Sequence, residues 1–338
     1  MHYLITGHTG FKGAWLTMLL KERGHDVSGI SLNPTNRSLF NTAEIQNVLE
    51  SDFRLDIRNS HQLESALDEI QPDVIIHMAA QPLVRESYRD PVTTYDTNIA
   101  GTLNVLKATS GTPSVKAQLI ITTDKVYKNF NRREGYSETE ILGGHDPYSS
   151  SKAIADLLAQ AWVKSVKGCP TAIARAGNVI GGGDISLDRL IPDLVNSYSN
   201  NVIPALRFPN AVRPWQHVLD CLNGYLTLVD KLLTGNGTGV WNFGPVENEM
   251  RTVAEISDLV GEIWGVEKSW EKDNGDHPHE AGILNLNSSK ARLQLHWKDK
   301  LGFEESVRWT TEWYKNVYSG LSSIEATRRN IENFESMK

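Results

Sequence analysis

The first 180 residues alternate short β-branched runs with segments of helical periodicity, and this alternation constrains the fold more than any other feature. The predicted strands cover residues 2–7, 26–31, 53–56, 73–78, 117–123 and 171–179. The predicted helices between them cover residues 11–23, 60–70, 93–109 and 149–165. Because every parallel strand needs a crossover connection, this order predicts the α/β class, with a doubly wound parallel sheet covered by helices on both faces.

A glycine-rich turn follows the first predicted strand directly. The segment TGHTGFKG places Gly7, Gly10 and Gly13 between that strand and the first helix. Glycines here let a pyrophosphate approach the backbone, and the free N–H groups of the helix start face its charge. An ordinary tight turn would also contain glycines, but the position in a repeated βα pattern favours a dinucleotide site. We therefore expect a Rossmann domain.

The choice between NAD and NADP is less marked in the sequence. The second predicted strand ends at Gly29-Ile30-Ser31, without the acidic residue that often binds the ribose, and Arg37 lies beyond it. A solvated loop explains Arg37 better than a 2′-phosphate contact. Asp56 ends the next predicted strand and is expected near the adenine amine. We expect NAD, with NADP left open.

The second half of the chain is less regular after Gly181. A helix is expected near 218–233, and a strand at 240–243 that rejoins the first sheet. We expect a cofactor-binding domain of residues 1–180 and about 218–248. A smaller C-terminal substrate-binding lobe then takes about 181–217 and 249–338.

Charge and composition exclude several classes of protein. A net charge of −7 and a pI near 5.8 argue against binding to nucleic acid or to anionic membranes. No apolar run approaches the ~20 residues that span a bilayer, and the N-terminus is not typical of a signal peptide. The two cysteines, Cys169 and Cys221, form no disulfide framework and are expected to be reduced. These features predict a cytoplasmic protein.

Tyr148 and Lys152, in PYSSSK, lie four residues apart and so share one helix face. An ammonium near a phenol lowers its pKa, which suits Tyr148 to take a hydroxyl proton during hydride transfer. A surface pair would show the same spacing, but this one follows the fifth predicted strand, whose carboxyl end lies where a nicotinamide would be held. Thr123 ends that strand and can hydrogen-bond the same substrate hydroxyl.

With HMAAQ (77–81) and Asn98, these motifs resemble the extended short-chain dehydrogenase/reductase family. The resemblance implies a Rossmann core, a retained nicotinamide cofactor and, usually, a nucleotide-sugar substrate. The cofactor-binding residues predicted on this basis are Gly7, Gly10, Phe11, Gly13, Asp56, Ile57, Ala79, Ala80, Gln81, Asn98, Tyr148 and Lys152.

The tripeptide Thr123-Asp124-Lys125 indicates which reaction is catalysed. A 4,6-dehydratase needs an acid and a base besides the oxidation: the C4 ketone acidifies the C5 hydrogen, a base removes it, and an acid protonates the departing C6 hydroxyl. Asp124 could be that acid and Lys125 that base. Lys125 needs a lowered pKa, by burial or by the charge of Lys152 or the nicotinamide, and Asp124 needs the opposite shift. A solvated turn is the alternative.

Seven blocks extend the resemblance to the family of CDP-glucose 4,6-dehydratases: GHTGFKGAWL (7–16), HMAAQPLVRESY (77–88), TTDKVY (122–127), GGHDPYSSSKA (143–153), ARAGNVIGGGD (174–184), RLIPD (189–193) and RPWQHV (213–218). That family makes CDP-4-keto-6-deoxyglucose, a precursor of dideoxy sugars in bacterial surface polysaccharides such as O-antigen. The implied catalytic set is Thr123, Asp124, Lys125, Tyr148 and Lys152. The implied substrate contacts are Arg85, Asn178, Arg189, Leu190, Arg207, Arg213 and Glu280.

Several alternatives stay open. A nucleotide-sugar 4-epimerase, or a dehydratase for another nucleotide sugar, would share most of these motifs, and a regulatory NAD(P)-binding protein would share the glycine turn. The spacing of the histidines and acids in DHPHE (276–280) fits no established metal-ligand pattern, and we expect no metal site. The family resemblance implies a homodimer or higher homo-oligomer, formed by residues 93–109 and the Tyr148 helix.

Overall fold

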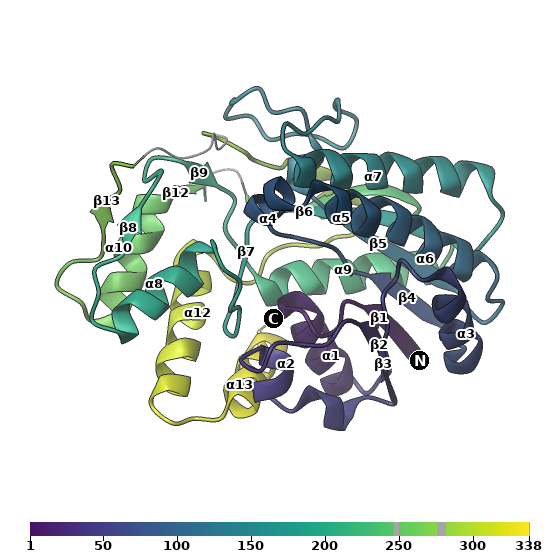
Figure 1. Ribbon diagram of the computed structural model, residues 1–338, viewed down its shortest axis with the longest axis horizontal. Coiled ribbons are helices and arrows are strands. Elements are labelled where there is room, and N and C mark those ends of the chain that lie inside the picture. Colours follow the sequence, from purple (N-terminus) through teal and green to yellow (C-terminus); the bar gives the residue numbers. More distant parts are fainter. Residues whose placement is uncertain (247–249, 276–281, 338) are drawn as a thin grey trace.

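The computed structural model describes residues 1–246, 250–275 and 282–337 (Figure 1). Its centre is a seven-stranded sheet in the order β11-β6-β5-β4-β1-β2-β3, with every pairing parallel. The strands are β1 (His2–Thr6), β2 (Asp26–Ser31), β3 (Ser51–Arg54), β4 (Val74–His77), β5 (Ala117–Thr123), β6 (Thr171–Ala176) and β11 (Gly239–Phe243). The predicted parallel sheet is confirmed, including the return of the strand near 240–243.

The strand order reverses between β1 and β4, which creates the crevice where doubly wound folds bind ligands. From β1 the chain runs outward to β2 and β3, and then continues on the other side with β4, β5, β6 and β11. Thr6 pairs with His77, and Thr123 with Ala176, at the carboxyl ends of their strands. The glycine turn and the Thr123 tripeptide therefore leave the sheet at the same edge.

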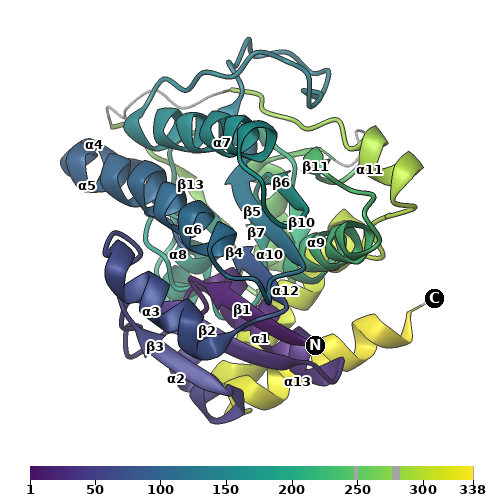
Figure 2. The same ribbon diagram turned by 90° about the vertical axis from the view of Figure 1, so that its right-hand side faces the viewer.

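Helices cover both faces of the sheet, as Figure 2 shows. One layer packs Leu63, Leu67 and Val105 against the sheet and is formed by α3, α6 and α7. The other layer contains α1 and α9, with Trp15, Leu222 and Leu226 in the main core. The bounds are α1 (Phe11–Glu22), α3 (Ser60–Ile70), α6 (Gly101–Ser110), α7 (Pro147–Ser165) and α9 (Val218–Leu233). α1, α3, α7 and α9 agree with predicted helices, and α6 forms the second part of the helix predicted at 93–109.

Three expected segments differ in detail. The third strand ends at Arg54, so Asp56 lies two residues beyond it. The run 171–179 is interrupted after Ala176, and its end, β7 (Val179–Ile180), pairs with β10 (Gln216–His217) outside the main sheet. The segment 93–109 is divided among α5 (Pro91–Tyr95), a π-helical turn at Asp96–Ala100 and α6.

The irregular part of the chain gathers beside the carboxyl edge of the sheet (Figure 1). Two short sheets form there, from β8 (Ala205–Leu206) with β13 (Glu271–Lys272) and from β9 (Val212–Arg213) with β12 (Arg251–Thr252). They lie beside α8 (Leu190–Ser199), α10 (Val253–Trp264) and α12 (Phe303–Tyr318). The last helix, α13 (Ser323–Ser336), packs against α12 and also back onto α1.

The remaining short elements are α2 (Leu39–Thr42), α4 (Val84–Arg89), α11 (Ser289–Gln294) and the 3-10 turns Ile45–Val48 and Asp124–Val126. Within the described residues, no helix is both long and apolar enough to traverse a bilayer. Cys221 is buried and Cys169 is half-buried, and both are free thiols.

Candidate active site

The glycine turn forms a cradle at the start of α1. Gly7 has a φ of +80°, and a Cβ there would lie 2.7 Å from the Ala79 nitrogen. A Cβ on Gly13 would lie 2.2 Å from the Gly7 oxygen. These two glycines permit β1, α1 and the end of β4 to pack closely. A side chain at either position would break this packing.

Gly10 has a different environment. A Cβ there would have one neighbour within 4 Å among the described residues, the Gly7 oxygen at 3.4 Å. Gly10 is also the N-cap of α1 and gives the first turn no side-chain cap. The N–H groups at the start of a helix can bind a pyrophosphate, and Gly10 leaves room for one to approach. The predicted dinucleotide cradle fits these residues.

The predicted adenosine side lies at the ends of β2 and β3. The Ser31 and Thr9 hydroxyls are 2.6 Å apart, and Arg37 is exposed. The Asp56 carboxylate accepts hydrogen bonds from the Arg58 guanidinium and from the Arg58 backbone N–H, and these bonds lower the pKa of Asp56. Both residues line an open surface hollow with His61. The Asp56 carboxylate is therefore a hydrogen-bond acceptor that is already paired with the Arg58 guanidinium.

Asn98 is part of the internal scaffold of the site. Its side chain accepts from the Gln81 N–H at 2.8 Å and donates to the Gln81 carbonyl and to the Ser151 hydroxyl. It is only 1% exposed. Asn98 thus links the segment after β4, where Ala79 and Ala80 lie, to the helix that carries Tyr148.

Tyr148 and Lys152 lie on the first turns of α7, which Asp146 caps by accepting from the Ser149 N–H at 2.8 Å. Both side chains are buried. The Lys152 ammonium donates to the Ile121 carbonyl of β5 at 2.8 Å. Burial lowers the pKa of Lys152 to about 8, helped by the charge of Lys12 and opposed by Asp156. The helix face is therefore fixed against β5, next to Thr123.

The pKa of Tyr148 differs from the sequence-based expectation. Burial raises it above the usual phenol value, although the Arg189 guanidinium and a hydrogen bond with Thr123 act to lower it. Lys152 was expected to lower this pKa, but desolvation is the largest influence on it, and the Lys152 ammonium donates to the Ile121 carbonyl. The contact with Thr123 places Tyr148 on the same side of the sheet as the tripeptide.

Asp124 and Lys125 have pKa values shifted in the directions that elimination needs. Burial raises the pKa of Asp124 against the influence of Lys125, and it lowers the pKa of Lys125 against the influence of Asp124. Arg189 and Arg213 add to the lowering at Lys125. The cations expected to lower the pKa of Lys125 were Lys152 and the nicotinamide ring. Arg189 and Arg213 are instead the cations that lower it in the structure.

The two oxygens of Asp124 have different environments. Oδ1 accepts from the Thr123 hydroxyl at 2.9 Å, whereas Oδ2 is buried and has no hydrogen-bond partner among the described residues. A Cβ on Gly177 would lie 3.1 Å from Oδ2 and 2.7 Å from the Pro214 Cγ, so only glycine fits beside this oxygen. A protonated Oδ2 could donate its proton to a group that comes within hydrogen-bond distance.

The four arginines among the predicted substrate residues form two groups. Arg189, at the N-cap of α8, and Arg213, in β9, act electrostatically on Lys125 and so belong to the catalytic surroundings. Arg85 and Arg207 instead meet at the Asp188 carboxylate, at 3.0 and 3.3 Å. The structure therefore brings Arg189 and Arg213 to the surroundings of the tripeptide, and it brings Arg85 and Arg207 together at Asp188.

Three further predicted substrate residues are not tested by these contacts. Asn178 lies between β6 and β7, and its carbonyl accepts from the Gln216 N–H. Leu190 packs against the main core at the start of α8. Glu280, with the DHPHE segment, lies outside the described residues.

Sequence reasoning did not identify two charged residues behind the catalytic segments. Asp156 lies four residues after Lys152 and therefore on the same face of α7. It forms a buried pair with Arg175 of β6, at 2.7 Å. The i+4 spacing was the available signal, but no sequence pattern links Asp156 to an arginine on a strand.

The sequence matches known proteins along nearly its whole length. Residues 4–310 match the family profile described as GDP-mannose 4,6 dehydratase. A CDP-glucose 4,6-dehydratase of Salmonella typhimurium is 42% identical over 343 residues, covering 98% of this chain and 95% of that protein.

Solved structures give the same fold. The dTDP-glucose 4,6-dehydratase of Bacillus anthracis in complex with NAD is 26% identical, with a TM-score of 0.81, and covers 95% of this chain and 98% of that one. The UDP-glucose 4-epimerase of Thermus thermophilus, also in complex with NAD, is 25% identical, with a TM-score of 0.80, and covers 93% of this chain and 99% of that one.

Proposed function

The chain belongs to the GDP-mannose 4,6-dehydratase family of extended short-chain dehydrogenases/reductases, and from this membership we propose that it is an NAD-dependent CDP-glucose 4,6-dehydratase. The reaction converts CDP-glucose to CDP-4-keto-6-deoxyglucose and water. The observation that carries this proposal is the buried pair Asp124 and Lys125 beside Tyr148, with the pKa of the acid raised and that of the base lowered.

NAD is the proposed cofactor. Gly10 and the uncapped start of α1 would hold its pyrophosphate, with Asp56 and Ile57 on the adenosine side and Lys152 on the nicotinamide side. A bound NAD would supply the oxidant for C4 and, once reduced, the hydride for C6, and its positively charged ring would favour an ionised Tyr148. The NAD complexes of the Bacillus anthracis and Thermus thermophilus proteins support this choice.

The remaining steps use side chains of this chain. Tyr148 accepts the proton of the C4 hydroxyl, which Thr123 orients through its own hydroxyl. Lys125 removes the C5 proton that the C4 ketone has made acidic. Asp124 gives its proton to the C6 hydroxyl, which leaves as water, and C5 regains a proton afterwards. Burial keeps Asp124 protonated and Lys125 neutral for a larger fraction of the time than in water.

The substrate is proposed to bind across the edge of the sheet, between two units. Residues 1–180 and about 218–248 would hold the cofactor, since β11 completes the sheet. Residues 181–217 and 249–338 would hold the nucleotide sugar through Asn178 at the boundary and Arg189, Leu190, Arg207 and Arg213, with Arg85 from the other side and Glu280. Guanidinium groups suit diphosphate oxygens.

The protein is proposed to act in the cytoplasm as a homodimer or higher homo-oligomer. Apolar side chains are exposed on the segments predicted to form this interface: Leu103 is 38% exposed, Ile154 44% and Leu157 53%. Val92, which lies just before residue 93 in α5, is 69% exposed. A second copy of the chain could cover them. Light scattering coupled to size-exclusion chromatography would measure the assembly.

Product mass separates this function from the alternatives. The purified protein is incubated with CDP-, UDP-, GDP- and dTDP-glucose, and the products are analysed by mass spectrometry. We expect CDP-glucose to lose one water. When the substrate carries deuterium at C4, we expect the deuterium at C6 of the product. An unchanged mass with altered configuration at C4 would indicate an epimerase, and water loss from another nucleotide sugar would reassign the substrate.

A further inference from the structure

A buried network joins the catalytic helix to the catalytic turn. Asp156 lies on α7 one turn after Lys152, and Tyr127 lies two residues after Lys125. Arg175 bonds to both of them. Its Nε and Nη2 donate to the two Asp156 oxygens at 2.8 and 2.7 Å, and its Nη1 donates to the Tyr127 hydroxyl at 2.8 Å.

We propose that Arg175 is a positioning residue that holds the turn bearing Asp124 and Lys125 in register with the helix bearing Tyr148. This inference rests on the proposed dehydration, because only that reaction requires the two segments to act on neighbouring carbons of one sugar. Epimerisation would need the helix and Thr123 alone.

The network holds the catalytic tripeptide at both of its ends. Before it, the Thr122 hydroxyl donates to Asp156 at 2.9 Å. After it, the Tyr127 hydroxyl accepts from Arg175 and donates to Asn242 on β11 at 2.8 Å. The residues between these two anchors, 123 to 126, therefore have little freedom to shift relative to α7.

Stability alone does not account for the pair. The side chains of Arg175 and Asp156 are 1% and 0% exposed. Removing both charges from water is so unfavourable that apolar residues of similar volume often stabilise a protein equally well or better. A bidentate pair does fix the relative orientation of two backbones, which apolar contacts specify less well. The network therefore fits a role in geometry.

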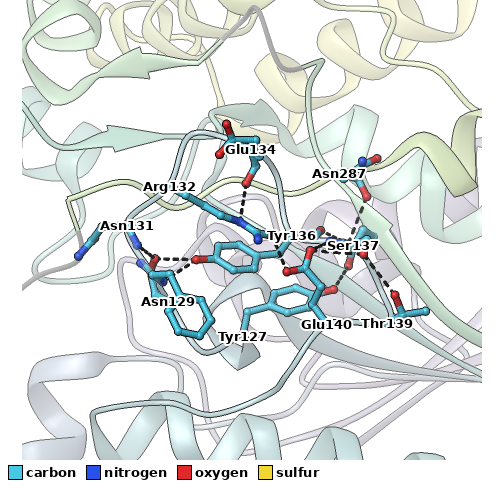
Figure 3. A network of polar contacts seen from close by, with 12 residues as sticks. Tyr127, Asn129, Asn131, Arg132, Glu134, Tyr136, Ser137, Thr139, Glu140 and Asn287 are labelled. Carbon is cyan, nitrogen blue, oxygen red and sulfur yellow. Dashed lines mark hydrogen bonds and ion pairs between the residues drawn. The ribbon is translucent and has the colours of Figure 1, made fainter.

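Tyr136 offers a matched control for Tyr127. The two rings stack with centroids 5.3 Å apart and an interplanar angle of 17°. Figure 3 shows that the Tyr136 hydroxyl points instead to Asn129, from which it is 3.1 Å away, and it also accepts from the Phe130 N–H. Replacing either tyrosine with Phe removes one buried hydroxyl from the same stack, but only Tyr127→Phe breaks the bond to Arg175.

The first experiment separates oxidation from elimination in the holoenzyme supplied with CDP-glucose. A displacement of about 1 Å in a reacting group can reduce a rate by about a hundredfold. For Tyr127→Phe we therefore expect elimination to slow by roughly tenfold to a hundredfold, with KM and C4 oxidation little changed. Reduced cofactor should then accumulate, visible by its absorbance. Tyr136→Phe should show no accumulation. Wild-type elimination by Tyr127→Phe, or equal effects of both variants, would overturn the proposal.

The second experiment does not depend on the reaction. Amide hydrogen exchange is measured in both variants and in the wild type, with thermal unfolding of each as the stability control. Residues 124–127 should exchange faster in Tyr127→Phe than in Tyr136→Phe, because the lost anchor allows that turn to open. Equal exchange in the two variants would overturn the positioning role whatever the substrate is. Absence of water loss from any nucleotide sugar, with the exchange difference intact, would reject only the proposed function.

Discussion

Lys152→Met should increase the stability of the protein near neutral pH while it abolishes catalysis. Lys152 is 5% exposed, and burial lowers its pKa from 10.5 to about 8. A shift of about 2.5 units corresponds to about 3.4 kcal/mol of unfavourable free energy in the folded state. The Met variant also loses the hydrogen bond to the Ile121 carbonyl, which a neutral amine would keep and which contributes about 0.5–1.5 kcal/mol. At pH 7 we therefore expect the Met variant to be more stable by roughly 2 kcal/mol.

The pH dependence follows from the direction of the shift. Below pH 8 the lysine is charged in both states, so the wild type carries the full penalty. Between about pH 8 and 10.5 the folded protein releases the proton while the unfolded chain keeps it, so the stability of the wild type rises. From pH 7 to pH 9 the wild type should gain about 1.4 kcal/mol relative to Lys152→Met. Other titrating groups largely cancel in this difference.

Urea unfolding at pH 7, 8 and 9, followed by tryptophan fluorescence, measures this difference. Lys164→Met is the control, because it removes an exposed lysine from the same helix. Turnover with CDP-glucose is measured in parallel, and Lys152→Met should show none. A difference between wild type and Lys152→Met that stays constant or widens as the pH rises would refute the conclusion that burial suppresses the charge on Lys152.

Three further predictions concern the site directly. Tyr148→Phe should keep cofactor bound but abolish C4 oxidation, since it removes the proton acceptor; undiminished turnover, measured by product mass, would reject this role. Lys125→Ala should block elimination while oxidation persists, so that reduced cofactor accumulates on addition of substrate; equal loss of both steps would indicate a structural lysine. Gly10→Ala should fold normally and weaken NAD binding at least tenfold, as calorimetry would show. Gly13→Ala, whose Cβ would lie 2.2 Å from the Gly7 oxygen, should fail to fold stably. Equal affinities of Gly10→Ala and wild type for NAD would show that the pyrophosphate does not bind beside Gly10.

The parallel sheet and most of its helices could be predicted from the sequence because local patterns determine them. Apolar β-branched runs marked strands buried on both faces, and the glycine turn identified the first crossover. The boundary of β3 was less predictable: the strand ends at Arg54, and Asp56 lies beyond it, bonded to Arg58. Polar residues at the edge of a sheet give little periodic signal, so the predicted end was wrong by two residues.

The site was predicted where a motif is contiguous and was incomplete where the contacts join distant segments. Asp124 and Lys125 stand next to Thr123 in the sequence, which was enough to suggest an acid and a base. The contact of Arg175 with Asp156 joins residues 19 positions apart on a strand and a helix, and the contact with Tyr127 spans 48 positions. Such contacts follow from the packing of α7 on β5 and β6, which no local pattern specifies.

One physical cause serves both members of the proposed acid–base pair. Desolvation disfavours the charged form of any group, so it raises the pKa of Asp124 and lowers that of its neighbour Lys125. Each residue opposes the shift of the other by attraction between opposite charges. Arg213 lowers both pKa values, so it opposes the rise at Asp124 and adds to the fall at Lys125. The elimination requires a neutral carboxyl group and a neutral amine side by side, a combination that water strongly disfavours. Burial of this turn against the sheet, held at its far end by Tyr127 and Arg175, is therefore as necessary to the chemistry as the identity of the two residues.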